Sequence, residues 1–298
     1  MRKFRIPQFD IVAHRYIFFG ISIAIILAGV VSFFIQGFNW GIDFTGGTEI
    51  ELNIGRQFDN QQLSLFIEKQ VGKAPQVSKN QQEPTHAIIK TVAFSDSIQR
   101  QTLYDALAKQ YKIKDMNKAV ISSSNFSATV GKQLQQQTIM AAVVALVLIL
   151  LYVTFRFEFN FGFAAIMSLV HDILIMVAIY TIFRVPMTSD FIAVVLTILG
   201  FSVNDTIVVF DRVRANLKHR KKGETYAMLA NKSIWQTMSR SINTVFCVLI
   251  AITFLLIFGV SAIREFAFPL FIGIISGSYS TIFLAVPITA MTRKEKKA

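Results

Sequence analysis

The sequence contains little cysteine, little proline and few charged residues. Its 298 residues include one cysteine and six prolines, and only 16% of them are charged. A lone cysteine, Cys247, excludes a disulfide within the chain and any cysteine-based metal site. Hydrophobic residues make up 53% of the chain, which is high for a soluble domain and indicates an integral membrane protein. Cys247 lies in an apolar run, where we expect it to pack.

Several apolar segments are long enough to cross a bilayer as helices, which takes about 20 residues each. The first is too long for the apolar part of a secretion signal, and no small-residue cleavage site follows it, so we expect a retained signal-anchor helix. Before the fifth span, the segment 224–238 has its apolar residues roughly on one face, which predicts an interfacial amphipathic helix. The expected spans are 16–35, 138–155, 161–183, 191–210, 242–260 and 266–291.

Lysine and arginine are concentrated in three segments, which are residues 1–15, the loop 211–240 and the tail 292–298. Cytoplasmic segments of membrane proteins carry such an excess. Six spans place these three segments on one side of the membrane, so we expect both chain ends in the cytoplasm. The net charge of +12 then reflects topology, and nucleic acid is not expected as a partner. Contact of the basic loop with anionic lipid is a second interpretation of its charge.

The segment 36–137 separates the first two spans and is expected outside the cytoplasm. With 11 basic and 9 acidic residues it is nearly neutral, and it is long enough to fold as a small domain. The order of its expected elements, β-α-β-β-α-β, predicts a ferredoxin-like α+β sandwich. The fold class is therefore a polytopic α-helical protein of six transmembrane helices with an α+β domain between helices 1 and 2. The periodicity predicts strands at 48–54, 76–79, 87–94 and 118–124, and helices at 59–71 and 98–111.

The fourth span carries a carboxylate well inside it. Asn204 and Asp205 follow an apolar stretch, and the next charges come only at Asp211 and Arg212. A carboxylate near the middle of a membrane helix costs about 2.5–3.5 kcal/mol on insertion scales, so by default it marks an ion or proton path. Ser202 lies on the same helix face and is expected to hydrogen-bond the protonated Asp205 carboxyl. A buried ion pair or a hydrogen bond between helices is the alternative.

Polar and small residues also occur in two other spans. His171 and Asp172 lie near the middle of the third span, where they either extend a proton path or join helices by hydrogen bonds. Two such ligands do not make a metal site, so no metal is expected. Gly273 and Gly277 form a G-x-x-x-G pattern in the sixth span, which predicts close helix packing.

A glycine-rich segment leads from the first span into the α+β domain. Its adjacent glycines allow a positive φ or a close backbone approach, and its spacing does not fit a nucleotide-binding loop. The simplest interpretation is a turn that starts the first strand. The characteristic residues are Gly41, Asp43, Phe44, Gly46 and Gly47.

These motifs resemble those of the SecF subunits in the SecD/SecF protein-export family. The similarity includes the glycine-rich segment, the pair His171-Asp172, and residues 196–212, 236–241 and 273–280, and it extends over nearly the whole chain. Phe201 stands where family members commonly have tyrosine, so a hydroxyl role at that position does not carry over.

The resemblance implies a function in the bacterial cytoplasmic (inner) membrane. A SecF subunit works with SecD beside the SecYEG channel, and its extracytoplasmic domain contacts emerging preproteins. The proton gradient supplies the energy, and no cofactor is implied. Asp205 and Arg240 would be elements of proton transfer, with a second aspartate supplied by SecD. The chain shows no pattern of a nucleophile with a base, so we do not expect an enzyme.

Two alternatives remain from the residues themselves. One is a structural subunit that stabilises a larger translocon without carrying protons. The other is one half of a proton-coupled transporter of small molecules, although the single small external domain offers no obvious apolar pocket for such a cargo.

Overall fold

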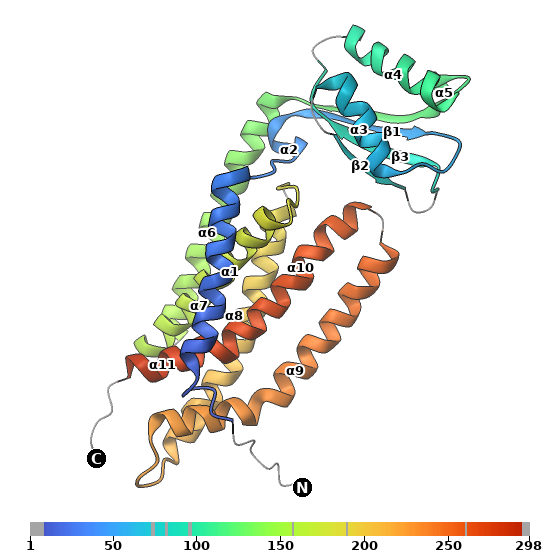
Figure 1. The fold of residues 1–298 in the computed structure, drawn as a ribbon. Helices are drawn as coiled ribbons and strands as arrows, with labels where there is room; N and C mark the ends of the chain where they lie inside the picture. Colours follow the sequence, from blue (N-terminus) through green and yellow to red (C-terminus); the bar gives the residue numbers. More distant parts are fainter. Residues whose placement is uncertain are drawn as a thin grey trace.

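The computed structural model describes residues 9–72, 75–80, 83–94, 97–156, 158–188, 190–259 and 261–293. Most of the basic residues expected at the two chain ends lie outside these ranges. The described residues form a helical bundle and a separate α+β domain at one end of it (Figure 1).

Among the described residues, six helices are long and apolar enough to cross a membrane, which agrees with the predicted number of spans. The helices α7, α8 and α10 lie inside the bundle, whereas α1, α6 and α9 are mostly exposed and form its outer surface. The start of α1 and the end of α11 both lie at the end of the bundle opposite the α+β domain (Figure 1). The helices are α1 (Arg15–Gln36), α6 (Ala128–Arg156), α7 (Phe159–Ile182), α8 (Asp190–Lys218), α9 (Tyr226–Phe258) and α10 (Ser261–Ser280), followed by η1 (Thr281–Ala285) and α11 (Val286–Thr292).

The helix that contains the fifth span differs from the prediction. The expected amphipathic helix at 224–238 and the span after it form one continuous helix, α9, whose first turns lie across the lower end of the bundle in Figure 1. The apolar face of this first part packs against the protein instead of the membrane interface. Tyr226, Leu229 and Ile234 are buried in one cluster with Val209 and Phe210 of α8. A helix that packs on protein and a helix that lies at a membrane interface both carry an apolar stripe, so the sequence pattern alone did not distinguish these two environments.

The α+β domain has the predicted ferredoxin-like topology. Its four strands form an antiparallel sheet in the order β2-β3-β1-β4, and α3 and α4 cover one face of it (Figure 1). Ile50, Leu52 and Ile89 of the sheet pack against Leu63 and Leu103 of these helices in one buried core. The elements are β1 (Gly47–Asn53), α3 (Asn60–Val71), β2 (Gln76–Lys79), β3 (His86–Thr91), α4 (Ser97–Tyr111), α5 (Met116–Ala119) and β4 (Val120–Phe126).

Candidate functional site

Asp172, in the middle of α7, is fully buried and accepts hydrogen bonds from neighbouring helices. Its Oδ2 accepts one from Ser202 Oγ of α8 at 2.6 Å and another from Ser280 Oγ of α10 at 3.0 Å. Its Oδ1 lies 3.2 Å from Nδ1 of His171. Three polar groups therefore surround this carboxylate, and it joins α7, α8 and α10.

His171 extends the same group of contacts to a fourth helix. Its Nε2 lies 3.0 Å from Ser22 Oγ of α1, and its ring stacks on Tyr279 at a centroid distance of 6.2 Å. Interhelical hydrogen bonds of this kind hold membrane helices together. The geometry of His171 and Asp172 fits the interpretation that the pair joins helices.

Asp205 lies one turn after Ser202 on α8 but points to a different helix. Its Oδ1 accepts a hydrogen bond from Ser241 Oγ of α9 at 2.7 Å. Its Oδ2 is also buried and has no hydrogen-bond partner among the described residues. Buried polar atoms are usually satisfied, so this carboxyl differs from the fully bonded Asp172.

The expectation that Ser202 bonds Asp205 is wrong. Ser202 donates to Asp172, and Ser241 takes the place beside Asp205. Residues three apart on a helix point about 60° apart, which is enough for Ser202 to meet α7 while Asp205 meets α9. The pattern along α8 identified the polar face but not the helices that cover it.

The other two residues expected near Asp205 lie at the surface of the bundle. Arg240 directly precedes Ser241 on α9, and its charge is within electrostatic range of Asp205 without a hydrogen bond between them. Both Arg240 and Asn204 are exposed.

An irregular turn in the last span completes the polar centre of the bundle. By this term we mean Asp172, Asp205 and the hydroxyl side chains around them. The π-helical turn η1 directly follows Ser280, and its first residue, Thr281, shares a hydrogen bond of 2.9 Å with Thr206 of α8. Pro287 lacks an N–H and cannot bond the carbonyl of Phe283, which explains a widened turn at this place. Sequence reasoning missed these two threonines, although the hydroxyl-rich run before Pro287 was a usable signal.

Gly273 and Gly277 lie on the side of α10 that faces α8. A Cβ added at Gly273 would overlap the side chain of Ile198, and one added at Gly277 would come within 3.2 Å of Ser202 Cβ. The absence of side chains at these two positions lets the helices approach closely. This approach also brings Ser280 of α10 to the same carboxylate that Ser202 contacts.

The glycine-rich segment forms a short helix, α2 (Ile42–Thr45), instead of a simple turn. Gly46 has a φ of +74°, and a Cβ at Gly47 would overlap the carbonyl oxygen of Thr91 in β3. The N–H of Gly41 donates to the carbonyl of Met187 at 2.9 Å, in the loop between α7 and α8. Asp43 and Phe44 belong to α2, which packs against the first turns of α6. The segment therefore holds one end of the domain to the bundle.

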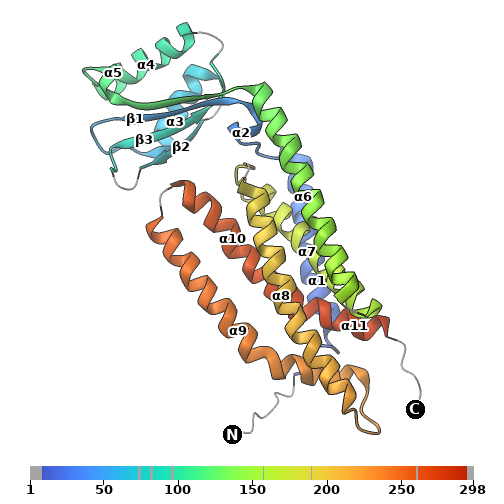
Figure 2. The same ribbon diagram turned by 180° about the vertical axis from the view of Figure 1, so that it is seen from behind.

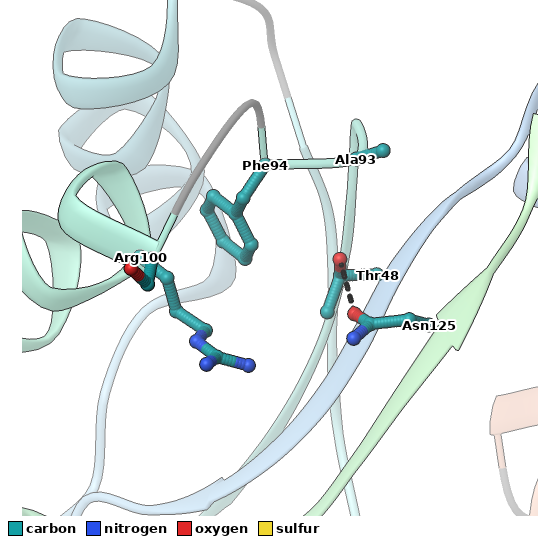
Figure 3. A pocket seen from close by; sticks show the side chains of 6 residues that line it. Thr48, Ala93, Phe94, Arg100 and Asn125 are labelled. Carbon is teal, nitrogen blue, oxygen red and sulfur yellow. Dashed lines mark hydrogen bonds between the residues drawn. The ribbon is translucent and has the colours of Figure 1, made fainter.

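The domain also contains a pocket of about 310 Å³ between β1, β4 and the start of α4 (Figure 3). Arg100 extends into it beside Phe94, and Thr48 Oγ1 donates to Asn125 Oδ1 at 2.8 Å. A guanidinium beside an aromatic ring suits a carboxylate-bearing group. Among the described residues, no group of three or more His, Cys, Asp or Glu side chains is placed to hold a metal ion.

The described residues define a multi-pass membrane protein with acid groups inside its bundle. It has six membrane-length helices, buried carboxylates where hydroxyl-rich helices meet, and an inserted ferredoxin-like domain. The family model for the C-terminal part of the protein export membrane proteins SecD/SecF matches residues 106–295, and the SecD/SecF GG motif matches residues 31–54. The chain belongs to the SecD/SecF family.

Related proteins cover nearly the whole chain. It is 35% identical over 295 residues to the protein translocase subunit SecF of Acidaminococcus fermentans, covering 97% of this chain and 99% of that protein. It is 36% identical to the protein translocase subunit SecDF of Bacillus subtilis, covering 94% of this chain and 38% of that protein.

The crystal structure of SecDF from Thermus thermophilus superimposes with a TM-score of 0.79 at 33% identity, over 95% of this chain and 38% of that one. The chain thus spans less than two fifths of the SecDF proteins. The family resemblance and the fold class predicted from the sequence are confirmed.

Proposed function

We propose that this chain is the SecF-type subunit of a protein translocase, which uses the proton gradient to drive late steps of preprotein transport. The observation that carries the proposal is the buried Oδ2 of Asp205, which has no hydrogen-bond partner among the described residues. A membrane-buried carboxyl with an unsatisfied oxygen is suited to gaining and losing a proton. The relatives named SecF and SecDF translocase subunits support the same role.

The surroundings of Asp205 support a change of its protonation state during a working cycle. Ser241 holds one oxygen in place, while the cationic Arg240 lies in electrostatic range but is not bonded to the other oxygen. Movement of Arg240 toward the carboxyl favours the charged form, and movement away favours the protonated form. Asp172 differs from Asp205, because both of its oxygens contact polar groups of Ser202, Ser280 or His171. We assign Asp172 and His171 to joining the helices.

The exposed polar residues of α8 and α9 support a partner in the membrane. Asn204 and Arg240 are exposed on two helices of membrane-spanning length, and polar side chains at membrane depth normally face protein or water. A SecD-type subunit is the partner that fits, because the SecDF relatives carry a much longer chain that includes the part matched here.

The orientation follows from charge. The connection between α8 and α9, which carries the basic residues up to Lys222, lies at the bundle end opposite the α+β domain (Figure 1), and we place this end in the cytoplasm with both chain ends. The α+β domain then lies outside the bacterial cytoplasmic membrane, next to SecYEG, where preproteins emerge. The Arg100 pocket gives it one place to contact an extended polypeptide. Proton flow is the energy source, and neither a cofactor nor a chemical step on a substrate is part of the proposal.

The test is Asp205→Asn in the complete complex with its SecD-type partner, reconstituted beside SecYEG in vesicles. Asparagine has nearly the same shape but does not titrate, so we expect export to lose its dependence on an imposed proton gradient. Asp211→Asn is the matched control, because Asp211 is a half-exposed carboxylate on the same helix. Gradient-driven export that stays normal in Asp205→Asn would rule out the proposal in favour of a purely structural subunit.

A further inference from the structure

The α+β domain touches the bundle at a second place, away from the glycine-rich segment. Gln76 Nε2 of β2 donates to Glu265 Oε1 of α10 at 2.6 Å, and Lys90 Nζ of β3 lies 3.8 Å from Glu265 Oε2. We call these three side chains the Glu265 contact. The face of the sheet that α3 and α4 leave uncovered lies above the N-terminal end of α10 in both views (Figures 1 and 2).

The Glu265 contact is partly shielded from water, and it depends on the pairing of one cation with several carboxylates. The Glu265 and Lys90 side chains are only 26% and 21% exposed. Lys90 also lies 3.8 Å from Glu49, and Asp43, Glu49 and Asp190 are all within electrostatic range of Glu265. Without the cation, these carboxylates would repel one another. Lys90 therefore keeps the sheet and α10 together at this place.

Within the described part of the chain, the domain is therefore attached to the bundle at two separate places. One end is held by α2, which packs on α6, and by the bond from Gly41 to Met187. The Glu265 contact supports the sheet over α10. If it were broken, the domain would remain attached at one end only and would follow movements of α10 poorly.

The helix α10 leads from this contact directly to the polar centre. Fifteen residues after Glu265, a distance of about 22 Å along a helix, Ser280 bonds Asp172. The next residue, Thr281, bonds Thr206, the neighbour of Asp205 in the chain. Between the two ends, Gly277 packs closely on α8. One continuous helix thus connects the sheet with the helix that carries Asp205.

We propose that the Glu265 contact couples the two parts of the molecule, so that a shift of α10 at the polar centre moves the α+β domain. The inference rests on the proposed function. Gln76, Lys90 and Glu265 act here as positioning residues, because they do not touch the proton-carrying groups. The helix α10 stays continuous through Pro269 and contacts both sites, so it is a physical route for such coupling, and mutations along it test the route directly.

The test measures export and proton flux separately in the reconstituted complex. In Glu265→Gln and in Lys90→Gln we expect gradient-driven export to fall about fivefold, the lower end of typical coupling between two sites. Proton flux should stay near that of the unmodified complex, because Asp205 is untouched. Lys109→Gln, an exposed charge on α4, is the control and should change neither quantity.

A second experiment replaces the Glu265 contact with a covalent link. Gln76→Cys with Glu265→Cys, in a Cys247→Ala background, removes the contact and should lower export, and a short bifunctional thiol reagent should restore it. Normal export in both single variants, or no recovery after cross-linking, would overturn the inference. Asp205→Asn is assayed in parallel: if it stops export while the Glu265 variants do not, only the coupling role fails. If Asp205→Asn exports normally, the proposed function fails and the inference with it.

Discussion

Removing the Asp172 carboxylate should destabilise the bundle much more than removing an exposed carboxylate. Asp172→Ala leaves Ser202, Ser280 and His171 without their shared partner in the centre of the protein. Hydrogen bonds between membrane helices contribute about 0.6 kcal/mol on average and up to about 1.7 kcal/mol, so the two that join Asp172 to Ser202 and Ser280 correspond to about 1–3 kcal/mol. Asp211→Ala loses two exposed ion pairs with nitrogen–oxygen distances of 3.8 Å, which amount to about 0–1 kcal/mol.

The measurement is the free energy of unfolding of the purified chain in mild detergent, by titration with a denaturing detergent. Asp172→Asn refines the test, because an amide keeps one accepting oxygen and can donate to a serine hydroxyl. We expect it to lose less than half of what alanine loses. It should also retain proton-driven export in the complex, unlike Asp205→Asn. If Asp172→Ala and Asp211→Ala are equally stable, the idea that Asp172 joins three helices is refuted.

Two glycine substitutions test the close contacts. Gly277→Leu should lower the free energy of unfolding by about 1–3 kcal/mol, as overpacking does, because its Cβ comes within 3.2 Å of Ser202. Gly20→Leu, with open space around its Cβ, is the control, and an equal loss in both would contradict the packing argument. Gly47→Ala should make the α+β domain more sensitive to protease, since the added Cβ overlaps Thr91, and unchanged resistance would show that the strand tolerates the shift.

Several features could be predicted because they depend on local patterns. The length of an apolar run decides whether a helix can span a membrane. Six spans were expected, and the described part of the chain contains six helices that are long and apolar enough. Periodicities of 2 and 3.6 residues placed the strands and helices of the domain in the right order, and β2 lies at the predicted residues 76–79. The two buried carboxylates, Asp172 and Asp205, stood out because charge is rare inside apolar spans.

The sequence alone thus determined the spans, the topology of the inserted domain and the positions of the acids inside the spans. Each of these follows from residues that are close together along the chain. Only the tertiary structure decided that Ser202 donates a hydrogen bond to Asp172, that Ser241 donates one to Asp205, and that Glu265 pairs with Lys90. A helix face specifies a direction in space but not the element that will lie there. That element is chosen when all helices pack at once, through contacts between residues far apart in the chain.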